Sequence, residues 1–175
     1  FEIGRKDGRG IDAASLSDYA GAEIMIVDRH ENSARTLQAV CQKFHLKILP
    51  VTSSAKQAAE QLMEYETGTK RLPAVIFIDT MLPNKEGFML AYKIRQQERY
   101  RAIKIVGLAA DPKIINSEEY QQAQFDMFLA KPIIKGEVVE LVLRLLGDKM
   151  PSARVISRDA LQKISCEGIR VLVVE

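Results

Sequence analysis

Residues 74 to 79 read Ala74-Val75-Ile76-Phe77-Ile78-Asp79, an apolar run that an aspartate ends. Valine, isoleucine and phenylalanine favour strands, and a run without polar alternation is typical of a strand buried on both faces. Four further stretches share this character: Ile24–Val27, Leu46–Val51, Ile103–Leu108 and Phe125–Ala130. We therefore predict five strands of a parallel sheet that helices cover on both faces.

Helical spacing appears in the segments between and after these strands. The apolar residues that recur three or four positions apart are Ala34, Leu37, Val40, Cys41 and Phe44, then Ala55, Ala58, Ala59, Leu62 and Met63, then Phe88, Ala91 and Ile94, and finally Val138, Leu141, Val142 and Leu145. Ser53 or Ser54 is available to cap the second helix, and Asp111-Pro112 suits the start of a fourth. This alternation predicts a flavodoxin-like, doubly wound α/β fold with five parallel strands in the order 2-1-3-4-5.

The pattern of strands and helices fills residues 22–147, which we interpret as one domain. Glycines and charges dominate residues 1–21, so we expect a linker from an upstream domain there. Residues 148–168 contain a proline and several serines and are interpreted as an interdomain linker. Residues 169–175 resemble the first strand, because an apolar run again ends in an acid. We expect them to begin a second domain of the same kind.

Charge and composition exclude several functions. The chain has 175 residues, and 25 lysines and arginines against 23 acids leave a net charge of +2, too small for a nucleic-acid-binding face. No apolar run approaches the roughly 18 residues that span a bilayer. Cys41 and Cys166 lie far apart without the spacing of a zinc site or a disulfide framework. We expect no contact of this segment with nucleic acid or membrane, and a cytoplasmic location.

Acidic residues stand at the ends of two strands that the predicted order makes neighbours. Asp28 follows the first strand and Asp79 the third, at the sheet edge where doubly wound folds bind ligands. Two charges ~4 Å apart repel by about 4 kcal/mol at an effective dielectric constant of about 20, so a cation is needed. Lys131, after the fifth strand, is one candidate and Mg²⁺ another. A carboxylate held there can attack phosphorus and form an acyl phosphate.

At these strand ends the sequence resembles the receiver domain of two-component response regulators and hybrid histidine kinases. The matching pieces are Ile24-Met25-Ile26-Val27-Asp28, Phe77-Ile78-Asp79-Thr80-Met81-Leu82-Pro83 with Gly87, and Phe128-Leu129-Ala130-Lys131-Pro132. The resemblance implies that Asp79 is the phosphoacceptor, that Asp28 belongs to the acidic pocket, and that Lys131 contacts the phosphoryl group through a loop with a cis bond to Pro132. It also implies that Mg²⁺ binds Asp28, Asp79 and the backbone carbonyl of Met81, and that Phe128 is the switch aromatic.

Two positions depart from the receiver pattern. Arg29 stands where the family has the acid that binds Mg²⁺ directly, and Ala109 replaces the serine or threonine that contacts the phosphoryl group. We therefore expect Mg²⁺ to bind weakly or not at all. Our hypothesis is that Arg29 pairs with Asp79 or Asp28 in place of the metal. The alternatives are that Arg29 points to solvent and that Glu31 supplies the missing acid.

Both histidines, His30 and His45, are interpreted as surface residues, because neither has a partner at metal-ligand spacing.

The predicted function is that of a degenerate receiver in a phosphorelay, acting mainly as a regulatory docking module around the fourth helix, fifth strand and fifth helix. The expected partners are a histidine kinase, a histidine phosphotransfer domain, or a neighbouring receiver or kinase domain of the same chain. A tandem arrangement fits a hybrid sensor histidine kinase or a response regulator with two receivers and an output domain equally well, and the resemblance favours the kinase, which a membrane could anchor. This segment itself is not expected to be an enzyme. The alternative is a receiver that is competent for phosphorylation.

A more distant alternative comes from residues 78–82, which also resemble haloacid-dehalogenase-type phosphohydrolases. Those enzymes place a general acid two residues after the nucleophilic aspartate, and that position is Met81 here. A thioether cannot transfer a proton, which argues against hydrolysis.

Overall fold

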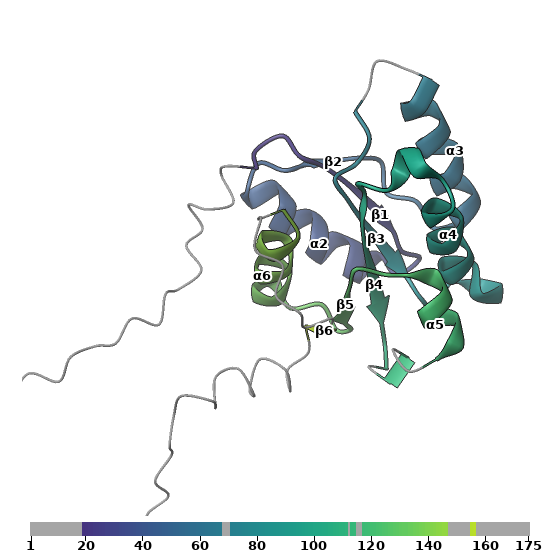
Figure 1. The fold of residues 1–175 in the computed structure, drawn as a ribbon. Helices are drawn as coiled ribbons and strands as arrows, with labels where there is room; N and C mark the ends of the chain where they lie inside the picture. Colours follow the sequence, from purple (N-terminus) through teal and green to yellow (C-terminus); the bar gives the residue numbers. More distant parts are fainter. Residues whose placement is uncertain (1–18, 68–70, 112, 115–116, 147–154, 157–175) are drawn as a thin grey trace, which may run out of the picture.

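A parallel sheet forms the centre of the computed structural model, and its strand order is β2-β1-β3-β4-β5-β6 (Figure 1). The strands are β1 (Glu23–Val27), β2 (Lys47–Ile48), β3 (Val75–Asp79), β4 (Lys104–Ala109), β5 (Met127–Ala130) and β6 (Val155–Ile156). The structure describes residues 19–67, 71–111, 113–114, 117–146 and 155–156. The predicted order 2-1-3-4-5 and the flavodoxin-like fold are therefore confirmed.

Helices cover both faces of the sheet, as Figure 1 shows. They are α2 (Glu31–Lys43), α3 (Ala55–Thr67), α4 (Glu86–Arg95), α5 (Glu118–Ala123) and α6 (Lys135–Leu146), with short 3₁₀ turns η1 (Pro83–Lys85) and η2 (Glu98–Tyr100). Helices α2 and α6 lie on one face, whereas α3, α4 and α5 lie on the other. No helix in the described ranges is both long and apolar enough to cross a membrane.

The central strands β1, β3, β4 and β5 are largely apolar, and nearly all of their residues are buried. Ile24 and Ile26 of β1 pack into the core on the side of α2 and α6, while Met25 and Val27 pack into the core on the opposite side. All five residues of β1 and all five of β3 are buried. Residues with period 2 therefore serve two separate cores, and no polar alternation remains in the sequence.

Two strands differ from the prediction. Strand β2 has two residues instead of the six predicted over Leu46–Val51. After Leu49 the next N–H that donates to β1 is that of Thr52, so the ladder is interrupted and returns as an isolated bridge between Val27 and Thr52. Strand β6 lies inside the segment interpreted as a linker and pairs in parallel with Phe128 and Leu129 of β5.

The fourth helix also begins later than predicted. Asp111 accepts a hydrogen bond from the backbone N–H of Lys113 at 2.9 Å and stabilises a turn, but α5 starts only at Glu118. Ser117 is its cap, with the Oγ accepting from the N–H of Tyr120. The cap predicted for the second helix is confirmed, because Ser54 Oγ accepts from the N–H of Gln57. The segments predicted as the first linker, apart from residues 19–21, and as the start of a second domain lie outside the described residues.

Candidate functional site

Three strand ends bring Asp28, Asp79 and Lys131 together. Asp79 is the last residue of β3, Asp28 follows β1 directly, and Lys131 follows β5. The register pairs Val27 with Ile78, so the two aspartates leave adjacent strands at the same edge. Both carboxylates are fully buried, with 0% of each side chain exposed.

Lys131 is the cation that the two carboxylates share. Its Nζ lies 3.0 Å from Asp28 Oδ2 and 3.1 Å from Asp79 Oδ1. The backbone N–H of Lys131 donates to the carbonyl oxygen of Ala109 at 2.7 Å, and the bond from Lys131 to Pro132 is cis. Asp28, Asp79 and Lys131 thus form one cluster, as expected from the sequence, while the roles that the resemblance gives them remain predictions.

The second group that reaches the carboxylates is the imidazole of His30. Its Nδ1 lies 3.1 Å from Asp79 Oδ2, 3.3 Å from Asp28 Oδ1 and 3.3 Å from Lys131 Nζ. The backbone N–H of His30 also donates to Asp28 Oδ1 at 2.8 Å, which holds the turn into α2. His30 is exposed, as predicted, with half of its side chain accessible, but its contacts with the two aspartates were not predicted.

Arg29 does not occupy the pocket, which corrects the hypothesis that it pairs with an aspartate. Its side chain is exposed, and within the described residues it forms no ion pair or hydrogen bond with Asp28 or Asp79. Side chains alternate in extended chain, so Asp28 and His30 can face the same side while Arg29 faces away. Glu31 does not substitute for the missing acid either, because it pairs with Arg35 on the outer face of α2. This alternation was the signal that could have identified His30.

The environments of the two carboxylates shift their pKa values in opposite directions. Burial raises the pKa of Asp28, and neither the N–H of His30 nor Lys131 fully offsets it. Burial also raises the pKa of Asp79, but the N–H of Met81, Lys131 and a hydrogen bond with Asp28 together lower that pKa below its usual value. Asp79 is thus the carboxylate that stays ionised most readily, as a nucleophile must.

Gly87 allows the helix that follows the pocket to approach β3 closely. A Cβ at this position would lie 2.4 Å from the backbone carbonyl oxygen of Asp79. No side chain fits there, so the glycine of the matching motif has a steric role. The loop between them keeps the N–H of Met81 2.9 Å from Asp79 Oδ1, while the Met81 side chain is largely exposed.

The positions associated with switching in the receiver resemblance are both buried. Ala109 ends β4 without a hydroxyl, and the nearby Thr80 hydroxyl donates to the carbonyl oxygen of Leu108 at 2.9 Å. The Phe128 ring packs against Tyr120 with centroids 4.7 Å apart, and it fills the space over Gly107, where a Cβ would lie 2.5 Å from the ring. Phe128 is thus held inside the core.

The donor set of this pocket does not match the shell that Mg²⁺ prefers. Mg²⁺ demands octahedral oxygen ligands, whereas the pocket offers two carboxylates, an imidazole nitrogen and an ammonium group. The residue after Asp28, Arg29, adds a guanidinium near the entrance and no oxygen. The entrance is an open hollow of about 600 Å³ that also borders His30, Met81 and Lys131.

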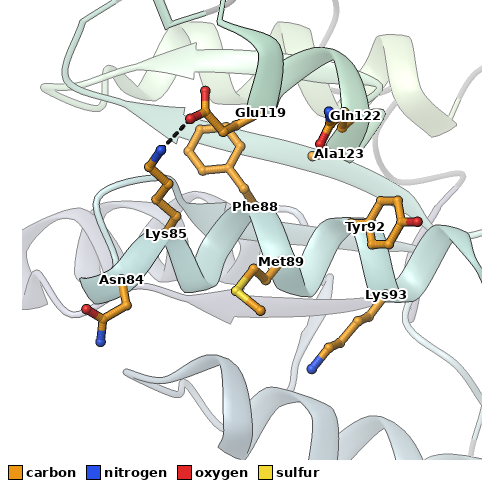
Figure 2. A pocket seen from close by; sticks show the side chains of 9 residues that line it. All are labelled: Asn84, Lys85, Phe88, Met89, Tyr92, Lys93, Glu119, Gln122 and Ala123. Carbon is orange, nitrogen blue, oxygen red and sulfur yellow. Dashed lines mark hydrogen bonds and ion pairs between the residues drawn. The ribbon is translucent and has the colours of Figure 1, made fainter.

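A separate apolar groove lies between α4 and α5, away from the acidic pocket. It has a volume of about 390 Å³, and Figure 2 shows Phe88, Met89 and Tyr92 of α4 lining it, with Lys85 paired to Glu119 across its end. Met89 and Tyr92 are 53% and 48% exposed, although Ala91 and Ile94 on the other side of the same helix are buried. Helix α4 is therefore apolar on its outer face as well, which the sequence prediction missed.

Comparison with known proteins agrees with this geometry. The family model described as "Response regulator receiver domain" matches residues 24–143, more than half of the chain. The chain is 27% identical over 149 residues to "Response regulator Rre1" of Synechocystis, covering 85% of this chain and 62% of that protein. It is 31% identical over 144 residues to "Hybrid signal transduction histidine kinase C" of Dictyostelium discoideum, covering 77% of this chain and 11% of that protein.

Among solved structures, the chemotaxis response regulator CheY4 of Vibrio cholerae has the same fold. Its TM-score is 0.61 at 18% identity, and the match covers 73% of this chain and all of that one. The ordered strand-end motifs, the sheet topology and the family match lead to one conclusion. This chain belongs to the response regulator receiver domain family.

Proposed function

We propose that this receiver domain works in a phosphorelay mainly as a regulatory docking module, with Asp79 in the phosphoacceptor position but impaired Mg²⁺-dependent phosphorylation. The observation that carries the proposal is the pocket itself. Lys131 and His30 already contact the carboxylates that would hold the metal, and Arg29 stands where the direct metal ligand is expected. Ala109 cannot donate a hydrogen bond to a phosphoryl oxygen.

The partners of such a module are a histidine kinase, a histidine phosphotransfer domain, or a neighbouring domain of the same chain. The hybrid kinase from Dictyostelium supports the kinase setting, of which this chain would be a cytoplasmic part. The haloacid-dehalogenase alternative lacks support, because Met81 supplies only its backbone N–H to Asp79. The receiver that is competent for phosphorylation stays as the alternative to be tested.

Small-molecule phosphorylation tests the chemical half of the proposal. The chain is incubated with acetyl phosphate and Mg²⁺, and the intact mass is measured, with a competent receiver in a parallel sample to verify the donor. We expect the chain to stay unmodified. A stoichiometric phosphoprotein that disappears in Asp79→Asn would contradict impaired chemistry and support the alternative.

The docking surface that we propose is the outer face of α4. Met89 borders two grooves, one against α5 and a second of about 520 Å³ against α3, where Met63 is also largely exposed. Flexible methionines suit contact surfaces that adapt to a partner. Lys93 lines both grooves, and no ion pair of it is found within the described residues. We commit to one occupant, an apolar helix of the histidine-containing kinase domain with an acidic residue facing Lys93.

Titration of the chain with that kinase domain tests the docking surface through amide chemical shifts. Perturbations are expected on α3 and α4, with Met89→Asp weakening the interaction and Gln42→Asp, on the exposed side of α2, leaving it unchanged. Asp79→Asn should bind as the wild type does. Perturbations centred on α5, β5 and α6 would instead favour the surface expected from the sequence.

A further inference from the structure

The pocket contains three ligand atoms of a kind and spacing that suit a transition metal. One oxygen of Asp28, the Nδ1 of His30 and one oxygen of Asp79 all lie within 4.8 Å of one another. Nδ1 is 3.1 Å from Asp79 Oδ2 and 3.3 Å from Asp28 Oδ1. Tetrahedral zinc with bonds of about 2.0–2.1 Å separates its ligand atoms by roughly 3.4 Å. The two distances from Nδ1 thus match this spacing, and an ion bound there would displace Lys131 Nζ from its contacts with Asp28 Oδ1 at 3.1 Å and His30 Nδ1 at 3.3 Å.

We propose that Asp28, His30 and Asp79 form a binding site for a divalent transition metal ion of the Zn²⁺ and Co²⁺ class. The imidazole nitrogen decides the class of ion. Imidazole suits Zn²⁺, Co²⁺ and Ni²⁺, whereas Mg²⁺ prefers a shell of oxygens and loses its water reluctantly. The same substitutions that oppose Mg²⁺ at this pocket thus provide a donor for a different metal.

The charges of the pocket favour an added cation. Two buried carboxylates face a single lysine, which leaves one formal negative charge when the imidazole is neutral. Lys131 contacts Oδ1 of Asp79, so Oδ2 stays directed at His30. Asp28 Oδ2 is buried and accepts no hydrogen bond in the described part of the chain, although Lys131 Nζ lies 3.0 Å away. A metal ion would complete the neutralisation that Lys131 begins.

The histidine is held in place but remains accessible. Its backbone N–H donates to Asp28 Oδ1 at 2.8 Å, which ties two of the three ligand residues to each other before any metal arrives. The side chain is 50% exposed and borders the entrance hollow, so an ion reaches Nδ1 from solvent. One of the four positions around a tetrahedral ion stays free for water or an anionic oxygen.

Direct metal binding tests this inference, and it does not require that Asp79 be phosphorylated. The full chain, carrying Cys166→Ser to remove one competing thiol, is freed of metal with a chelator and titrated with Zn²⁺ by calorimetry and with Co²⁺ by visible absorption. We expect one ion per chain and an affinity for Zn²⁺ roughly a hundredfold or more above that for Mg²⁺. Cys41 does not compete, because it is buried.

Two histidine variants identify the ligand. His30→Ala should weaken Zn²⁺ binding roughly tenfold or more, since even the hydrogen-bond partners of ligands contribute that much. His45→Asn is the matched control, because asparagine tolerates the positive φ of 57° at that position. It should bind Zn²⁺ as the wild type does. Amide spectra of the variants verify that each one is folded.

The proposal is overturned if Zn²⁺ fails to bind, or if it binds equally well to the folded His30→Ala variant. A loss in His45→Asn equal to that in His30→Ala would also overturn it, by placing the ion elsewhere. These outcomes are separate from the proposed function. Saturable binding of Mg²⁺ and beryllofluoride would contradict impaired phosphorylation and leave the Zn²⁺ result standing, whereas absence of Zn²⁺ binding leaves impaired phosphorylation untouched.

Discussion

His30 Nδ1 lies 3.1 Å from Asp79 Oδ2, on the carboxylate whose other oxygen is 3.1 Å from Lys131 Nζ. Each oxygen of the predicted phosphoacceptor thus has a nitrogen of its own. The carboxylate of Asp79 therefore stays paired inside the pocket although Arg29 faces away from it. The predictions below follow from this arrangement and from the packing that supports it.

Restoring the family's residue types at positions 29 and 109 should restore Mg²⁺-dependent phosphorylation. We expect Arg29→Asp combined with Ala109→Thr to raise the affinity for Mg²⁺ and to permit labelling of Asp79 by acetyl phosphate. The acid would supply an oxygen ligand and the threonine a hydroxyl donor. Intact mass after labelling measures the gain. Arg101→Asp, the same charge change at an exposed site, is the control and should stay inert.

Neutralising Asp28 and neutralising Asp79 should change the free energy of unfolding in opposite directions. Because the pKa of folded Asp28 is raised, its carboxylate opposes folding at neutral pH, so Asp28→Asn should be more stable than the wild type at pH 7. The gain should vanish below about pH 4, where the unfolded chain is also protonated. Because the pKa of Asp79 is lowered, Asp79→Asn should lose stability at pH 7, and the difference should shrink as pH falls through the folded pKa.

Urea unfolding at several pH values measures these differences in the free energy of unfolding. Shifts of the same sign for both variants at pH 7 would contradict the opposite environments assigned to the two carboxylates.

Gly87 should tolerate no side chain. In Gly87→Ala the new Cβ would meet the Asp79 carbonyl at 2.4 Å, so we expect a loss of about 1–3 kcal/mol in the free energy of unfolding. Gly136→Ala, in α6 with no atom within 4 Å, should instead gain up to about 1 kcal/mol. Chemical denaturation of both variants provides the comparison, and an equally mild effect at both sites would speak against the close approach of α4 to β3.

Cys41 should be unreactive while the chain is folded. Burial raises the pKa of its thiol to about 12, so almost no thiolate exists at pH 8. In a Cys166→Ser background, we expect an aromatic disulfide reagent to react slowly in native buffer and rapidly in denaturant. Fast reaction in native buffer would show that α2 opens readily from the sheet.

The sequence predicted the sheet well because both faces of its strands are buried. Short apolar runs such as residues 75–78 and 105–109 are typical of a parallel strand that is covered on both faces. The two edge strands were harder to predict from the sequence, because β2 and β6 have only two residues each, too few to show any periodicity. The start of α5 at Glu118, with Ser117 as its cap, was missed because Asp111 stabilises a separate turn.

The pocket was predicted in its composition but not in its full geometry. Strand order alone places Asp28 and Asp79 together, since neighbouring parallel strands end at one edge. The sequence hypothesis placed Arg29 in the pocket, because its positive charge suits the two aspartates. In extended chain, however, side chains alternate between the two sides, so His30 faces the same side as Asp28 and Arg29 faces away. The apolar outer face of α4 was overlooked because the prediction for this helix considered only Phe88, Ala91 and Ile94, which are buried.

The most direct test of the central claim is a titration with Mg²⁺ and beryllofluoride, followed through the amide chemical shifts around Asp79. The account predicts no saturable change at low millimolar metal, because an imidazole and an ammonium group stand beside the carboxylates and Arg29 supplies no oxygen ligand for Mg²⁺. Saturable shifts at Asp79, Met81 and Ala110 in that range would contradict it and would identify a receiver that binds phosphoryl groups in the ordinary way.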